Sequence, residues 1–208
     1  MTGRRIDLST WERAPQYALF RSFAQPHFNI TARVDVSRVM EAKRHRGLSP
    51  FRATLWAVGQ AIHALPAFRT RFDAEGPILY DRVAFSTTVD KSDGSLGFTY
   101  LDWEADRAAF DRVARSEIEA VAAGAPRASN TDRLDLVYAS CLPWLDHTAL
   151  DSAMPHADDC IPRLSWGRIV PTATGHDMAM TCTVHHAIAD GRHVAEFFTA
   201  TQEALDSL

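Results

Sequence analysis

The sequence predicts an α+β fold in which helices pack against a mixed β-sheet, and three observations lead to this prediction. Apolar residues at helical spacing alternate irregularly with short runs of period two, unlike the regular alternation of a doubly wound parallel fold. No repeat, low-complexity tract or Pro/Gly/Ser-rich linker interrupts the 208 residues. With 46% hydrophobic residues the chain can bury one sizeable core. We therefore expect a single domain over residues 1–208.

Two helices are predicted in the first third of the chain. The first begins near Val36, with Asp35 as N-cap and Gly47 as its stop. The second begins at Ser49-Pro50, where an N-cap serine and a first-turn proline precede an apolar stripe that ends at Pro66. This second helix is expected to be buried.

The rest of the chain predicts several strands and two more helices. A third helix over about 105–123 should present Phe110, Val113, Ile118 and Val121 on one face. A last amphipathic helix runs from Asp190 to the C-terminus. Period-two runs bounded by turn signals predict strands at 77–80, 83–89, 96–103, 134–140, 162–170 and 178–184.

Charge and cysteine content exclude several function classes. The 22 basic and 26 acidic residues are interspersed, which argues against nucleic acid or an anionic membrane as the main partner. No apolar stretch has the length of a signal peptide or a membrane span, so we expect a cytoplasmic protein. Cys141, Cys160 and Cys182 show no CxxC spacing, which fits a reducing compartment. A nucleophilic role for Cys141 is an alternative without any nearby signal for a lowered thiol pKa.

The strongest local signal is HHAIADGRHV over residues 185–194, where an expected strand ends and the last helix begins. Three interpretations compete. In the first, the histidines are structural and Asp190 only caps the last helix. In the second, His186, Asp190 and His193 bind a metal, although the usual i, i+4 histidine pair is missing. In the third interpretation, one histidine of the pair points into a cleft and takes a proton from an alcohol.

This segment resembles the HHxxxDGxHV signature of the chloramphenicol acetyltransferases, within the superfamily of CoA-dependent acyltransferases, and other stretches follow in the family's order. They are WERAPQYALF with FNIT near the N-terminus, LPAFRTRF and ILYDRV in the middle, and the Ser-x-x-Pro-Trp match SCLPW. The resemblance covers essentially the whole chain. Condensation domains of peptide synthetases and lipoyl acyltransferases share the HxxxDG core, but the former are about twice as long and the latter carry further segments.

The resemblance implies a two-layer fold and a set of catalytic residues. His186 corresponds to the general base, whereas His185 is structural. Asp190 corresponds to an aspartate that pairs with the arginine of the Trp-x-Arg segment, here Arg13. Ser140 corresponds to the serine that stabilises the tetrahedral oxyanion.

Binding residues follow from the resemblance more loosely. Ser165 stands where the family has a threonine that holds a water near the intermediate, and Arg168 where it often has a lysine near the CoA site. Phe28, Tyr138 and Phe98 are candidates for the lining of the acceptor pocket. Departures affect the acceptor: Ala189 and Arg192 replace a cysteine and an aromatic residue, Ser49 replaces a tyrosine, and the stretch 87–98 fits poorly.

The resemblance implies an acetyltransferase that confers antibiotic resistance. It would move the acetyl group of acetyl-CoA, a co-substrate, onto a hydroxyl of a small molecule, with chloramphenicol the leading acceptor, and with neither a metal nor a tightly bound cofactor. A related acyltransferase acting on another alcohol or amine, for example in natural-product biosynthesis, is the alternative, and a binding domain without turnover is a second one. The resemblance also implies a homotrimer with active sites at subunit interfaces.

Overall fold

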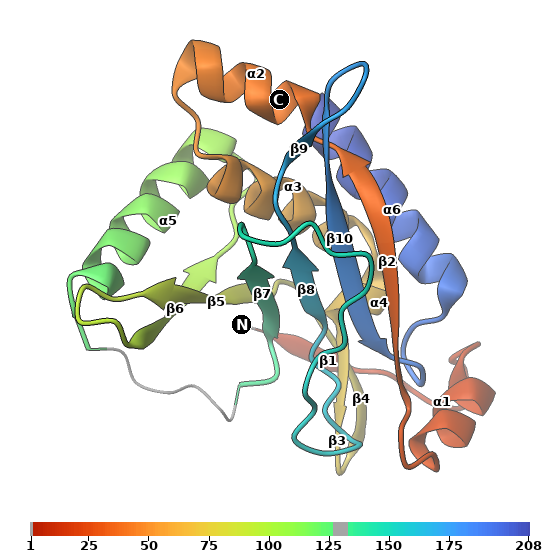
Figure 1. Ribbon diagram of the computed structural model, residues 1–208. Coiled ribbons are helices and arrows are strands. Elements are labelled where there is room, and N and C mark those ends of the chain that lie inside the picture. The colour runs from red at the N-terminus through yellow and green to blue at the C-terminus, as the bar shows by residue number, and fades with distance from the viewer. Residues whose placement is uncertain (1, 127–132) are drawn as a thin grey trace.

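The computed structural model describes residues 2–126 and 133–208, which form two β-sheets and six helices (Figure 1). The helices are α1 (Ala14–Arg21), α2 (Ser37–Arg46), α3 (Pro50–Ala64), α4 (Pro66–Arg69), α5 (Arg107–Ala122) and α6 (Gly191–Asp206). The strands are β1 (Gly3–Arg5), β2 (His27–Asp35), β3 (Thr70–Asp73), β4 (Gly76–Tyr80), β5 (Ala84–Asp90), β6 (Leu96–Asp102), β7 (Leu136–Cys141), β8 (Arg163–Trp166), β9 (Val170–Pro171) and β10 (His176–His185). None of the helices in these ranges is long and apolar enough to cross a membrane.

The larger sheet is mixed, as the sequence predicts. Its strand order is β2-β10-β8-β7-β5-β6, with β9 paired to β10. β7 runs parallel to both β5 and β8, whereas the other neighbours pair antiparallel. β1, β4 and β3 form a separate antiparallel sheet. The fold is therefore α+β.

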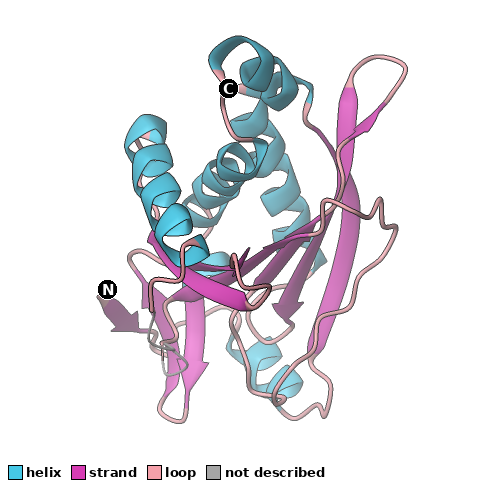
Figure 2. Cartoon of the chain, turned by 60° about the vertical axis from the view of Figure 1, so that its left-hand side comes forward, coloured by secondary structure: helices cyan, strands magenta, loops and turns pink. Residues whose placement is uncertain are grey.

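The helices cover one face of the larger sheet and bury the main core there. Figure 2 shows the long helices α2, α3, α5 and α6 grouped on one side of this sheet, and α1 lies apart at its lower end (Figure 1). α3 lies in the middle of the helical layer and packs against α6 and α5. Alternate residues of the strands point into this core, among them Val137, Leu164, Met180 and Cys182. Two layers thus enclose one large apolar cluster.

Local signals explain most helix boundaries. Ser49 caps α3 by accepting from the Arg52 N–H. Gly47 ends α2 in the left-handed conformation, with φ 67°. The predicted cap of α2 is shifted by one residue, because Val36 is the N-cap and the Asp35 carboxylate accepts from Ser37.

One predicted apolar stripe is wrong at a single position. Phe110 and Val121 of α5 are buried, as expected, but Val113 lies on the outer face with 53% of its surface exposed. Ala114 takes its place in the core. A small residue fits there because α5 crosses close to the sheet edge and to α3.

The face of the sheet away from the helices carries polar side chains in rows across the strands. Ser140, Ser165, Thr181 and Thr31 are register partners on four successive strands. Two residues along, the row is Tyr138, Arg163, Thr183 and Asn29. Successive side chains of a strand point to opposite faces, so these two rows share one face. The segment between β7 and β8 passes over it (Figure 1).

Candidate active site

His186 lies in the turn between β10 and α6. Its main-chain N–H donates to the Pro26 oxygen at 2.8 Å. Its Nδ1 lies 3.1 Å from the main-chain oxygen of Ala189. Because a carbonyl oxygen only accepts hydrogen bonds, Nδ1 must carry the proton of the neutral ring. The lone pair of His186 is therefore on Nε2, where it can accept a proton from a substrate.

Two aromatic rings hold the imidazole of His186 in place. The ring of Phe20 stacks on it with a centroid distance of 3.8 Å and an interplanar angle of 5°. The ring of Phe28 packs at 4.7 Å with a tilt of 49°. Phe28 was predicted to line the acceptor pocket, and the structure places it beside the histidine. Phe20, which α1 carries, is a site residue that the sequence interpretation missed.

The guanidinium of Arg13 ties the N-terminal segment to the turn that carries His186. Its Nη1 donates to Oδ2 of Asp190 at 2.7 Å, so the two predicted partners form an ion pair. Its Nη2 donates to the main-chain oxygen of His186 at 2.6 Å, and its Nε donates to that of Ala187 at 3.1 Å. The three nitrogen atoms of the side chain therefore bind the short segment 186–190 through two main-chain oxygens and one carboxylate.

Asp190 has a second set of partners at the start of α6. Its Oδ1 accepts from the main-chain N–H groups of Arg192 and His193, which makes it the N-cap. The same oxygen lies 2.8 Å from Nδ1 of His193. Burial alone would raise the pKa of Asp190, but the hydrogen bonds from Arg13 and His193 outweigh it and hold this pKa far below its usual range. The carboxylate is thus a fixed negative charge.

His185 lies in the interior, unlike its neighbour. It is 2% exposed, and its Nδ1 accepts from the main-chain N–H of Ala187. Burial, reinforced by nearby His27, lowers the pKa of His185 to about 4. A neutral, enclosed imidazole that accepts a backbone hydrogen bond supports the turn rather than exchanging protons with a ligand.

Ser140 lies at the point where two cavities meet. One cavity of about 830 Å³ and another of about 840 Å³ share Thr88, Ser140 and Leu142 in their linings. Ser140 is the next-to-last residue of β7 and is partly exposed. A hydroxyl in this position can contact ligands from both sides.

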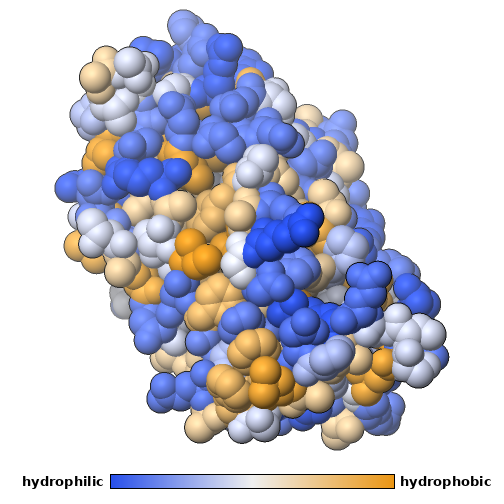
Figure 3. Space-filling view, turned by 90° about the vertical axis from the view of Figure 1, so that its right-hand side faces the viewer, coloured by the Kyte–Doolittle hydropathy of each residue, from blue (hydrophilic) through white to orange (hydrophobic). Residues whose placement is uncertain are grey.

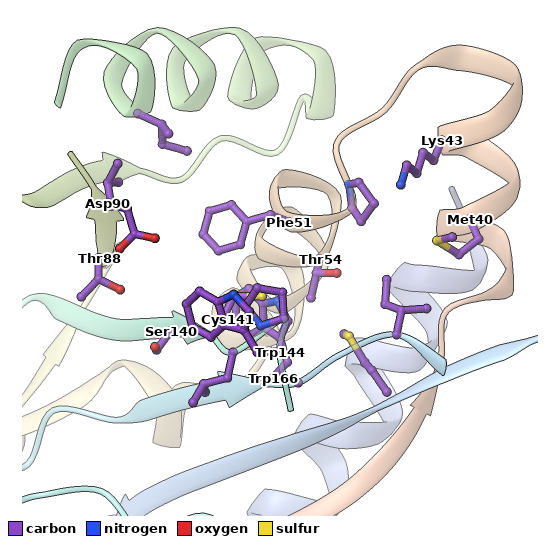
Figure 4. A pocket seen from close by; sticks show the side chains of 18 of the residues that line it. Met40, Lys43, Phe51, Thr54, Thr88, Asp90, Ser140, Cys141, Trp144 and Trp166 are labelled. Carbon is purple, nitrogen blue, oxygen red and sulfur yellow. The ribbon is translucent and has the colours of Figure 1, made fainter. Parts of the chain in front are cut away.

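The 830 Å³ cavity is mainly apolar and opens near the helices. Figure 4 shows Phe51, Trp144 and Trp166 around it, Ser140 at its floor, and Lys43 extending toward it from α2. Arg168 is exposed on the turn after β8, between the lining residues Gly167 and Ile169. An apolar channel with cations near it suits a long chain that ends in phosphates.

The 840 Å³ cavity lies on the polar face of the sheet. Three of the predicted binding residues, Tyr138, Phe98 and Ser165, line it, and Phe28 does not. Ser165 is the register partner of Ser140 on β8. The residues of the segment over the sheet, 150–153, close the cavity from the other side.

Within one chain, Ser140 and His186 are too far apart to act on the same atom. The register links Ser140 through Ser165 to Thr181, which lies two strands away and five residues before His186. With strands about 4.8 Å apart and a rise of about 3.3 Å per residue, the separation is roughly 19 Å. A reacting group next to both side chains would need them to come from different copies of the chain.

Two alternatives from the sequence find little support in the geometry. Burial raises the pKa of the Cys141 thiol to about 11, so this group is not a thiolate at neutral pH. In the parts of the chain that the structure describes, no three His, Cys, Asp or Glu side chains are grouped as metal ligands. His193 instead contacts Asp190.

Comparisons with known proteins indicate a family and a fold for the chain. The family described as chloramphenicol acetyltransferase matches residues 1–202. A chloramphenicol acetyltransferase of Clostridium perfringens is 23% identical over 204 residues, covering 95% of this chain and 92% of the relative. A solved structure of a chloramphenicol acetyltransferase superposes with a TM-score of 0.91 at 27% identity, covering 98% of this chain and 100% of the other. A probable dihydrolipoamide acetyltransferase of Listeria monocytogenes shares the fold, with a TM-score of 0.70 at 14% identity and coverage of 98% and 94%.

Proposed function

The chain belongs to the chloramphenicol acetyltransferase family, and from this premise we propose that it transfers the acetyl group of acetyl-CoA to a hydroxyl of a small molecule. Chloramphenicol is the leading acceptor, because the family and the similar proteins carry its name. The observation that carries the proposal is the setting of His186, whose Nδ1 is held by Ala189 and whose Nε2 is left to accept a proton. We expect a cytoplasmic enzyme.

His186 acts as the general base of a direct transfer. Its Nε2 takes the proton of the acceptor hydroxyl while the oxygen attacks the thioester carbonyl of acetyl-CoA. The tetrahedral intermediate collapses with cleavage of the carbon–sulfur bond, and the thiolate of CoA receives the proton from the imidazolium. The products are the acetyl ester and free CoA. The protein itself is unchanged after each cycle.

Ser140 stabilises the oxyanion of that intermediate by donating its hydroxyl hydrogen. A well-placed donor of this kind lowers the free-energy barrier of acyl transfer by about 3 to 4 kcal/mol. The position of Ser140 between both cavities supports this role, because the acetyl group must lie where the two substrates meet. Ser165 on the adjacent strand supplies a second hydroxyl close to that point.

The two cavities are assigned to the two substrates. The apolar cavity with Trp144 and Trp166 takes the pantetheine arm of acetyl-CoA, and Lys43 and Arg168 lie where its phosphates would emerge. The cavity over the polar sheet face takes the acceptor. Each substrate then reaches Ser140 from its own side.

The catalytic base for each pocket comes from a neighbouring subunit of a homotrimer. The separation of roughly 19 Å between Ser140 and His186, derived from strand spacing, supports a shared site. Exposed apolar side chains near His186 support an interface there: Leu19 of α1 is 54% exposed and Phe23 is 45% exposed. Figure 3 shows apolar patches at the lower end of the face where α1 lies. Heterologous contacts of this kind close into a ring.

Thiol release from acetyl-CoA in the presence of chloramphenicol tests the proposal. Purified protein should release CoA only when the acceptor is present, and His186→Ala should abolish this while its circular dichroism stays unchanged. Ser140→Ala should lower kcat by about a hundredfold or more with little change in either KM. Near-normal turnover by His186→Ala would remove the general-base mechanism. An acceptor panel then distinguishes chloramphenicol from other alcohols and amines.

A further inference from the structure

The acceptor cavity is more polar than the cavity assigned to acetyl-CoA. Ten of its 17 lining residues have polar side chains, against six of 21 in the other cavity when cysteine and tryptophan are counted as apolar. Eight of the ten have a hydroxyl group. They are Ser86, Thr87, Thr88, Tyr100, Tyr138, Ser140, Ser152 and Ser165.

Arg163 is the cation of this cavity, and it is almost enclosed. Its side chain is 13% exposed and pairs with Asp159, which is 9% exposed, at 2.7 Å. Its Nη1 donates to Oδ1 of Asp159 at 3.3 Å and to the main-chain oxygen of Ile161 at 3.0 Å. The guanidinium carbon lies 5.2 Å from the centre of the Tyr138 ring. Burying such a pair is costly compared with apolar side chains of similar volume, so the fold alone gives no reason to place it in a ligand cavity.

The register places this pair at a defined distance from the reaction point. Arg163 faces Tyr138 across β7 and β8, two residues along from the partners Ser140 and Ser165. At about 3.3 Å per residue, Arg163 and Tyr138 lie roughly 7 Å along the strands from Ser140. An acceptor whose reacting oxygen is next to Ser140 therefore lays its more distant atoms over Arg163 and Tyr138.

The charges around Arg163 favour a neutral ligand over an anionic one. Asp159 already offsets the guanidinium, and Asp151 adds a carboxylate to the same cavity, where its Oδ1 accepts from Asn29. Neutral oxygen atoms can accept from the remaining guanidinium hydrogens and exchange hydrogen bonds with the hydroxyls of the lining. The rings of Phe98 and Tyr100 supply apolar surface for the carbon frame.

We propose that Arg163, positioned by Asp159, is a specificity determinant of the acceptor site and selects a neutral, polyoxygenated alcohol over an alcohol with a bare hydrocarbon frame. This inference rests on the proposed acetyl transfer and on the assignment of this cavity to the acceptor. A site built to hydrogen-bond oxygen atoms rejects an analogue without them, because its buried polar groups are then left unpaired. Chloramphenicol itself carries several oxygen atoms and can enter such a site.

The test compares two primary alcohols of the same shape. Phenyl β-D-glucopyranoside carries one ring oxygen and three secondary hydroxyls, and (3-phenoxycyclohexyl)methanol has the corresponding carbon frame without them. The wild-type protein should acetylate the glucoside with a kcat/KM about tenfold or more above that of the carbocycle. Arg163→Met/Asp159→Asn removes both charges at similar volume and keeps an oxygen at position 159 for the Ile161 N–H. It should raise KM for the glucoside about tenfold or more, leave kcat and KM for acetyl-CoA nearly unchanged, and keep or raise kcat/KM for the carbocycle, because the variant has no buried charges left unpaired by it.

Arg52→Met/Asp111→Asn is the matched control, since this partly buried pair joins α3 to α5 and lines neither cavity. Equal wild-type efficiency toward both alcohols, or the same loss with both alcohols in the Arg163 variant, overturns the inference and leaves acetyl transfer standing. If the wild type acetylates neither alcohol nor chloramphenicol, the proposed function fails instead. Calorimetric titration with the glucoside then decides the inference: binding that weakens about tenfold in the variant upholds it, and equal or absent binding overturns it.

Discussion

The imidazole of His186 lies flat on the ring of Phe20, with the two planes 5° apart and their centroids 3.8 Å apart. The stack fixes the plane of the base, while the hydrogen bond to the Ala189 oxygen fixes its rotation within that plane. The two contacts come from different directions. Together they aim Nε2 along a single line, which a proton transfer in a crowded site requires.

Loss of the Phe20 ring should therefore slow the reaction without weakening substrate binding. Phe20→Ala removes the stack, so His186 samples further rotamers and kcat falls by about tenfold, whereas KM for acetyl-CoA stays within about twofold. Phe20→Tyr keeps the ring and should retain most of the activity. Steady-state kinetics with both variants check this. An equal loss in Phe20→Tyr would mean that stacking is not the reason.

Arg13 and Asp190 should show strong coupling in a double-mutant cycle on activity. Asp190→Asn retains a good N-cap for α6, so its effect isolates the loss of charge toward Arg13. Because Arg13 is 11% exposed and Asp190 36% exposed, the pair lies between surface and buried cases, and we expect a coupling energy of about 2 kcal/mol. Arg13→Val, Asp190→Asn and the double variant are compared by kcat/KM. Purely additive effects would contradict the inference that the two residues act together to position the turn that carries His186.

The enclosed His185 should make stability depend on pH. Its folded pKa of about 4 lies below the ordinary value near 6.5, so the unfolded chain binds more protons between these values. The stability is fully present above pH 6.5 and declines as the pH falls toward 4. Between pH 7 and 5 the free energy of unfolding should drop by roughly 1 to 2 kcal/mol through this group. Urea unfolding across this range measures the slope.

His185→Asn should reduce that slope. The asparagine side chain can accept from the Ala187 N–H in place of Nδ1, which keeps the turn while removing the titrating ring. His156→Asn, at an exposed histidine, is the matched control. A slope that is identical in wild type and His185→Asn would show that other groups carry the pH dependence.

The sequence predicts those parts of the fold that have strong local signals. Ser49-Pro50 fixes the start of α3 because a cap and a first-turn proline act within four residues. β2 was not predicted as a strand, although Phe28 and Ile30 alternate with Asn29 and Thr31 in its sequence. The alternation continues through Ala32 and Val34, so the local signal for a strand is present and was overlooked, and the strand pairs along its length with β10.

Only those site residues that belong to sequence motifs could be predicted. The pairing of Arg13 with Asp190 was available from the resemblance, since both belong to matched segments. Phe20 carries no such signal, because its contact with His186 arises only when α1 folds back on the turn after β10. The same holds for Arg163: it begins β8, no motif marks it, and its place in a cavity depends on strand register.

Mixing two inactive variants should restore activity if each site draws on two subunits. In His186→Ala every subunit keeps Ser140, and in Ser140→Ala every subunit keeps His186. Unfolding and refolding an equimolar mixture forms mixed trimers, in which some interfaces combine an intact histidine with an intact serine. Random assembly through a heterologous interface predicts that about a quarter of the sites are complete. Thiol release should therefore recover to about a quarter of the wild-type rate, and light scattering should give three times the 23.1 kDa subunit mass.

Each variant refolded alone is the control. A mixture as inactive as its parents, or a fully active monomer, would place both groups in one chain, contrary to the separation that the strand register gives.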